Sequence, residues 1–116
     1  MPYLVRHTKP DIAAGICYGW TNLDVADTFS EEVGAITAAL PPNIESIYSS
    51  PLQRCAKLAA CIATHVGCTK LHYADALKEM NFGSWEMQTW NSIDANELNA
   101  WMENYVRTEV PGGESF

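Results

Sequence analysis

Short apolar runs alternate with helix-length segments along this chain, and this alternation constrains the fold more than any other feature. Residues 3–6, 44–48 and 71–73 form apolar runs that are too short for helices and suit strands buried in a sheet. Helix-length segments separate them, as they do in βαβ units with parallel strands. The order therefore predicts an α/β fold in which helices flank a mainly parallel sheet.

The segments between these runs have the spacing and the end signals of helices. Residues 29–40 repeat apolar side chains at helical intervals before two prolines. The next helix is expected to use Ser50 as its cap and Pro51 as its first residue, and to end near Val66, before a glycine. Both helices are long enough to cover one face of a sheet.

The rest of the chain divides into one more helix and two irregular stretches. Residues 94–106 predict an amphipathic helix, and Asp94 with Glu97 at its start resembles a capping box. Residues 8–27 and 77–85 show no sustained period. Because long loops in compact domains are usually functional, residues 8–27 are expected to contribute to a site.

Charge and composition exclude several classes of partner. A net charge of -7 argues against nucleic acid and anionic membrane surfaces as partners, because both repel an acidic protein. No apolar run approaches the length of a spanning helix. The cysteines lack the CxxC spacing of a zinc site and suit free thiols in a reducing cytoplasm, where we expect the protein to reside. They are Cys17, Cys55, Cys61 and Cys68.

Four motifs occur along the chain in a fixed order. They are LVRHT at residues 4–8, SSPLQR at 49–54, LKEMNFGSWE at 77–86 and PGGES at 111–115. In this order they resemble the histidine phosphatase superfamily, which includes cofactor-dependent phosphoglycerate mutases and α-ribazole phosphatases. The resemblance covers essentially the whole chain, and it implies a phosphoglycerate mutase-like fold with three α/β/α layers.

The resemblance implies two catalytic residues. His7 matches the histidine that attacks phosphorus and forms a phosphohistidine, which splits one difficult displacement into two easier steps. Glu79 matches the carboxylic acid that protonates the leaving alkoxide and then helps to activate water. Glu86 is a nearby competitor for the acid role, and only the alignment of the LKEMNFG motif separates the two.

The resemblance also implies the residues that hold the substrate. Arginine grips phosphate oxygens with a rigid fork of donors, which suits Arg6 and Arg54 to this task. Thr8 stands where the family usually has glycine, and its hydroxyl could donate to phosphate. Glu114, in PGGES, is expected to give structural support. The residues that match the loop passing the substrate are Tyr18, Gly19, Thr21 and Asn22.

One histidine of the family's pocket has no counterpart among these residues, because it lies in a strand after the PGGES element. We therefore expect residues 1–116 to be the N-terminal portion of a single histidine phosphatase domain whose C-terminal part is missing. An exposed sheet edge would then favour association between chains. The sequence does not predict the oligomeric state.

These expectations combine into one predicted function and several alternatives. The favoured function is hydrolysis of a small phosphorylated metabolite, with α-ribazole 5'-phosphate of cobalamin biosynthesis as the substrate. Neither a metal nor another cofactor is expected, because the arginines and histidines do the charge work that Mg²⁺ does in kinases. The alternatives are a phosphoglycerate mutase-like enzyme, a phosphohistidine-protein phosphatase and a non-catalytic phosphate-binding module.

Overall fold

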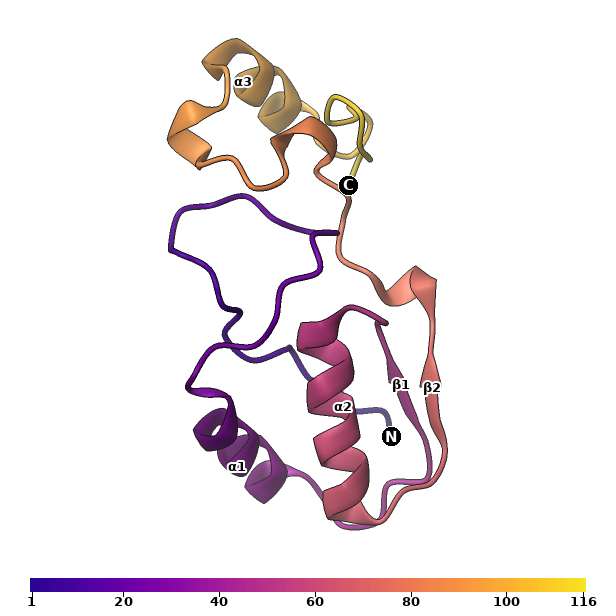
Figure 1. Ribbon diagram of the computed structural model, residues 1–116. Coiled ribbons are helices and arrows are strands. Elements are labelled where there is room, and N and C mark those ends of the chain that lie inside the picture. Colours follow the sequence, from indigo (N-terminus) through magenta and orange to yellow (C-terminus); the bar gives the residue numbers. More distant parts are fainter. The chain divides into compact units, whose positions relative to one another are not determined.

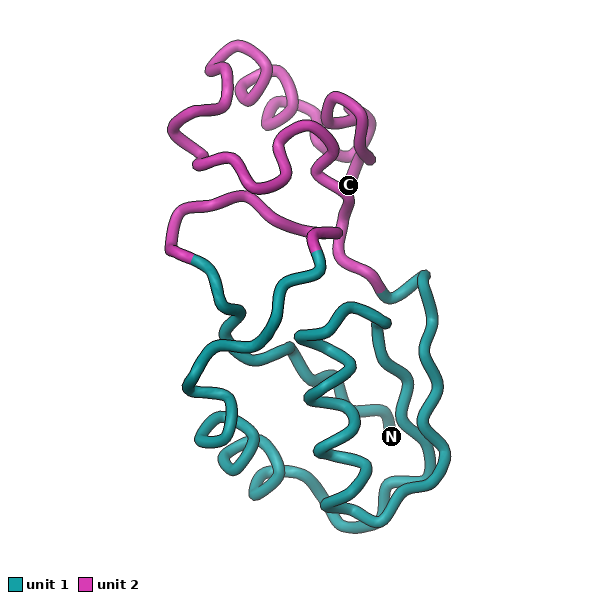
Figure 2. The backbone as a smooth tube through the Cα atoms, viewed as in Figure 1, with its two compact units in different colours: residues 1–12, 22–77 teal, residues 13–21, 78–116 magenta.

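The computed structural model describes residues 1–116 (Figure 1). Contacts divide the chain into two compact units, which Figure 2 distinguishes by colour. The first unit contains residues 1–12 and 22–77, and the second contains residues 13–21 and 78–116. The irregular stretch after His7 is therefore shared between the two units.

The first unit is a βαβ motif with one additional helix. Its elements in chain order are α1 (Phe29–Ala39), β1 (Ile47–Ser49), α2 (Gln53–Val66), β2 (Leu71–Tyr73) and a short 3-10 helix, η1 (Asp75–Leu77). The two strands pair in parallel, with Ile47 opposite Leu71. Helix α2 contacts both strands and α1 and lies between them in Figure 1. The predicted parallel arrangement is confirmed for these two strands.

Helix α2 ends as predicted but begins later than predicted. Gly67 adopts a left-handed conformation with φ of 68°, which stops the helix after Val66. At the other end the cap residue is Leu52, so the prediction of Ser50 as cap and Pro51 as first residue is wrong. The Ser50 hydroxyl instead accepts a hydrogen bond from the Leu52 amide and shapes the turn before the helix.

Residues 3–6 do not form the predicted strand. They have no strand pairing, and Leu4 is 99% exposed. A run of this length has no stability of its own, because an isolated strand gains its hydrogen bonds only from a neighbouring backbone. The sheet therefore has two strands, and only part of the expected layered architecture is present.

The second unit consists mainly of loops packed around an aromatic core. Its elements are the 3-10 helices η2 (Gly83–Trp85) and η3 (Trp90–Ser92) and the helix α3 (Ala95–Glu103). Trp101 meets Trp85 and Phe82 in edge-type contacts, with ring centroids 5.8 and 6.3 Å apart. The fully packed residues of this core are Cys17, Trp85, Ile93 and Val110.

Only one half of the predicted capping box forms at α3. The Asp94 side chain accepts from the amides of Asn96 and Glu97, so the cap residue is confirmed. The Glu97 carboxylate does not accept a hydrogen bond from the Asp94 amide. It accepts one from Nε1 of Trp85 at 3.4 Å. The helix ends at Glu103 rather than near residue 106. No helix in either unit combines the length and the apolar character that a membrane crossing requires.

Candidate active site

His7 carries a defined ring tautomer because of its neighbour. Its Nδ1 lies 2.7 Å from the carbonyl oxygen of Thr8. A carbonyl can only accept a hydrogen bond, so Nδ1 carries the hydrogen. In the neutral ring, Nε2 then holds the lone pair. Thus the Thr8 carbonyl leaves Nε2 as the nitrogen of His7 that is free to accept or to react.

Thr8 brings a buried hydroxyl next to this histidine. The residue is 2% exposed, and its Oγ1 has no hydrogen-bond partner. A buried hydroxyl without a partner costs free energy, and such groups are usually satisfied by a ligand or by water. Thr8 is therefore suited to contact a bound oxyanion.

Arg54 adds a fixed positive charge to the same unit. It is the second residue of α2 and is 1% exposed, although most arginines lie at the surface. The first turn of a helix already has a positive potential, so a cation there raises that potential further and favours an anion nearby. Arg6, the other predicted phosphate ligand, is exposed.

Glu86 organises the loop that includes residues 18–21. Its Oε1 accepts from the Gly19 amide at 2.9 Å, the Thr21 amide at 3.0 Å and the Thr21 hydroxyl at 2.6 Å. Its Oε2 accepts from the amides of Trp20 at 3.2 Å and Phe82 at 2.9 Å. One carboxylate therefore accepts the amide hydrogen bonds that backbone carbonyls would accept if this loop were a strand in a sheet.

These contacts distinguish the two carboxylates that the sequence offered for the acid role. Burial by itself would raise the pKa of Glu86, but the hydrogen bonds from Thr21, Gly19 and Phe82 outweigh it and hold the pKa below its ordinary value. Glu86 is thus ionised, and both of its carboxylate oxygens already accept hydrogen bonds. Glu79 is exposed, and its Oε1 accepts only a local bond from the Met80 amide at 3.0 Å. Glu79 is the better candidate for a proton donor.

Gly19 is required by packing within the second unit. A Cβ atom at this position would lie 1.9 Å from the carbonyl oxygen of Met80, so no side chain fits without moving the backbone. The amide of Gly19, which belongs to the loop expected to pass the substrate, donates to Glu86. Contact of Tyr18, Gly19 and Thr21 with substrate stays a prediction.

The PGGES motif packs against the chain around η2 in the same unit. The Asn81 amide donates to Oε2 of Glu114 at 2.7 Å, and the Glu114 amide donates to the Asn81 carbonyl at 2.9 Å. At Gly83, with φ of 52°, an added Cβ would lie 2.3 Å from the carbonyl oxygen of Pro111. Glu114 therefore supports the chain near residue 81, in line with its predicted structural role.

The predicted site residues are divided between the two units. Arg6, His7, Thr8 and Arg54 belong to the first unit, whereas Tyr18, Gly19, Thr21 and Glu79 belong to the second. No group of three or more metal-binding side chains lies close enough to hold an ion. Sequence reasoning missed the loop-binding role of Glu86, for which its place directly after the buried Trp85 was the one available signal.

Comparison with known proteins identifies the family. Residues 2–116 match the model of the histidine phosphatase superfamily (branch 1). The chain belongs to this superfamily. A comparison with curated protein sequences gives no match.

Two solved structures are similar to the chain over most of its length. The histidine phosphatase chain is similar to TTHB049 from Thermus thermophilus, with 27% identity and a TM-score of 0.71 over 97% of this chain and 62% of that one. It shares its fold with a mycobacterial glucosyl-3-phosphoglycerate phosphatase, with 24% identity and a TM-score of 0.81 over 94% of this chain and 53% of that one. The chain thus spans between about half and two thirds of the length of these structures.

Proposed function

We propose that this histidine phosphatase hydrolyses a small phosphate monoester through a phosphohistidine at His7. The observation that carries the proposal is the bond between Nδ1 of His7 and the Thr8 carbonyl, because it leaves the lone pair on Nε2. The buried Thr8 hydroxyl and the buried Arg54 guanidinium support it, since both suit phosphate oxygens.

The proposed reaction has two steps. In the first, Nε2 of His7 attacks phosphorus, a P–N bond forms, and the P–O bond to the leaving alkoxide breaks. The alkoxide takes a proton from a carboxylic acid. In the second step a water molecule attacks phosphorus and passes a proton to the carboxylate, the P–N bond breaks, and inorganic phosphate leaves.

We assign the acid to Glu79. The assignment rests on the resemblance of the LKEMNFG segment to the family motif and on the engagement of Glu86 by five hydrogen bonds. A carboxylate that already accepts this many bonds is held in its charged form and is a poor proton donor. Glu79 has no such set of donors around it.

For the substrate we propose α-ribazole 5'-phosphate. The support is that two segments resemble those of α-ribazole phosphatases, RHTKPD at residues 6–11 and CYGWTN at residues 17–22. A mycobacterial structural relative, 22% identical over 94% of this chain with a TM-score of 0.80, has been solved with inorganic phosphate. Initial rates on α-ribazole 5'-phosphate and on sugar phosphates would rank the substrates, and a clear preference for another monoester would replace this assignment.

The decisive experiment asks whether His7 becomes phosphorylated. The full product of the gene is mixed with an aryl phosphate, and released phosphate and intact mass are followed together. We expect turnover and an added phosphoryl group that is lost in acid. Both should vanish in His7→Ala and persist in His65→Ala, which removes an exposed histidine at the end of α2. An active enzyme whose adduct survives His7→Ala would overturn the mechanism, and absence of both turnover and adduct would overturn the function.

A further inference from the structure

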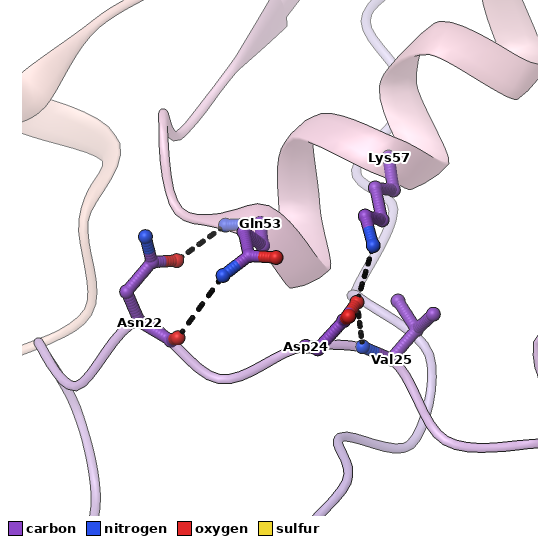
Figure 3. Close-up of polar contacts among 5 residues, drawn as sticks. All are labelled: Asn22, Asp24, Val25, Gln53 and Lys57. Carbon is purple, nitrogen blue, oxygen red and sulfur yellow. Dashed lines mark hydrogen bonds and ion pairs between the residues drawn. The ribbon is translucent and has the colours of Figure 1, made fainter.

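The start of α2 is capped by a residue from a distant part of the chain. The Gln53 amide donates to Oδ1 of Asn22 at 2.7 Å, and Nε2 of Gln53 donates to the Asn22 carbonyl at 3.3 Å (Figure 3). The cap residue Leu52 offers no side-chain acceptor. Asn22 therefore satisfies one of the first amides of α2, which have no partner within the helix.

A second contact joins the same loop to the next turn of α2. Nζ of Lys57 lies 2.5 Å from Oδ1 of Asp24, which also accepts from the Val25 amide at 2.7 Å (Figure 3). The hydrogen bond from Lys57 and then that from Val25 hold the pKa of Asp24 below its ordinary value. Because Gln53 and Lys57 are four residues apart, they lie on one face of the helix. Two contacts one turn apart fix the direction of the loop along α2.

The loop is also joined to the segment that follows His7. Residues 9–11 run antiparallel to residues 24–26, with Pro10 and Val25 forming a bridge. Two backbone hydrogen bonds hold this pairing, from the Ala26 amide to the Lys9 carbonyl at 3.0 Å and from the Asp11 amide to the Asp24 carbonyl at 2.9 Å. Residues 22–26 thus contact both residues 9–11, which follow His7, and the helix of Arg54.

We propose that Asn22, assisted by Asp24, is a positioning residue that sets the place of Arg54 relative to the segment of His7. In this role Asn22 acts through the helix, because its side-chain oxygen accepts from Gln53, the neighbour of Arg54. This inference rests on the proposed function, and it changes the expected role of Asn22 from substrate contact to alignment. A small displacement of a phosphate-binding arginine is costly, because transition-state charge is stabilised only by donors held in place.

The test compares two substitutions at Asn22 that have similar size and different chemistry. Asn22→Leu removes the acceptor, whereas Asn22→Asp keeps it and adds a charge that a helix start favours. With an aryl phosphate as probe, we expect Asn22→Leu to slow phosphorylation of His7 by about 10- to 100-fold, with a larger effect on kcat than on KM. Asn22→Asp should restore most of the rate. Asn43→Leu, at another exposed asparagine, is the matched control and should leave the rate unchanged.

Hydrogen exchange separates failure of this inference from failure of the proposed function. Asn22→Leu should speed exchange at the amides of Gln53, Asp11 and Ala26 together, whether or not the protein turns over. If only Gln53 responds, Asn22 is a local cap and the coupling is wrong. If all three respond in an active enzyme but the rate stays at the wild-type value, the positioning role is wrong. If the wild type forms no adduct, the proposed function fails, and the exchange result still decides the coupling.

Discussion

Each of the two units of this chain is stabilised internally, and the contacts that stabilise them differ. The first unit is made of regular elements, in which α2 buries Leu58 and Ile62 and packs against two parallel strands. In the second unit, one carboxylate and a few aromatic rings replace regular backbone pairing, and Glu86 alone accepts five hydrogen bonds. The comparison teaches that a unit poor in secondary structure depends on very few side chains. The stability of the second unit should therefore depend on a few side chains, whereas that of the first unit should be distributed over many.

The largest expected effect is loss of the aromatic core of the second unit. Trp85 is 2% exposed, so Trp85→Ala should cost about 3–5 kcal/mol through lost burial and the cavity it leaves. Hydrogen exchange should show lost protection at the Met87 and Trp90 amides and retained protection in α2. Trp20→Ala, at a tryptophan that is 43% exposed, is the matched control and should cost about 1 kcal/mol or less. Equal loss of protection in α2 would mean that the two units unfold as one.

The next effect concerns the carboxylate of Glu86. In Glu86→Gln the side-chain NH₂ group faces donors that a carboxylate oxygen now satisfies, so we expect a loss of about 2–3 kcal/mol in the free energy of unfolding. Chemical denaturation would measure it. Glu103→Gln, an exposed glutamate at the end of α3, should change stability by less than about 0.5 kcal/mol. A neutral result at Glu86 would show that loop 18–21 is held by other contacts.

Acid should reduce the difference in the free energy of unfolding between the wild type and Glu86→Gln. Since the pKa of Glu86 is lowered in the folded protein, its contribution is complete above the ordinary value of 4.5 and is lost as the pH falls through the lower folded value. The gap in unfolding free energy between wild type and Glu86→Gln should therefore narrow as the pH falls below 4.5 and through the lower folded value. Asp24→Asn, which removes an exposed carboxylate of the first unit, should give a much smaller gap. A gap that is independent of pH would contradict this account.

The smallest effects test the first unit, where two glycines should respond with opposite signs. Gly67 has a φ of 68° and open space around it, so Gly67→Ala should cost about 1 kcal/mol from backbone conformation alone. Gly34 lies within α1, also in open space, and Gly34→Ala should stabilise by about 0.5–1 kcal/mol. Thermal unfolding of the two variants would measure both. A large loss at either position would mean that this unit, too, depends on single residues.

Sequence patterns predicted the first unit well because its elements depend on local periodicity and end signals. The parallel pair, α1 and the end of α2 before Gly67 all follow from such patterns. The prediction of a strand at residues 3–6 was wrong, because a strand exists only where another backbone can pair with it. The patterns also did not predict the roles of Asn22 and Glu86, because both act on amides distant in the chain.

The sequence by itself determined the family of this protein, through four motifs in order, and it named His7, Arg54 and Glu79 as the residues to test. Only the tertiary structure decided the tautomer of His7, the burial of Thr8 and Arg54, and the engagement of Glu86 rather than Glu79. The physical reason is that a motif specifies residue types, whereas a proton's position and a carboxylate's charge depend on which groups the fold places within hydrogen-bonding distance. Asn22 illustrates this, because the chain alone placed it in a substrate loop and the fold placed its side chain on α2.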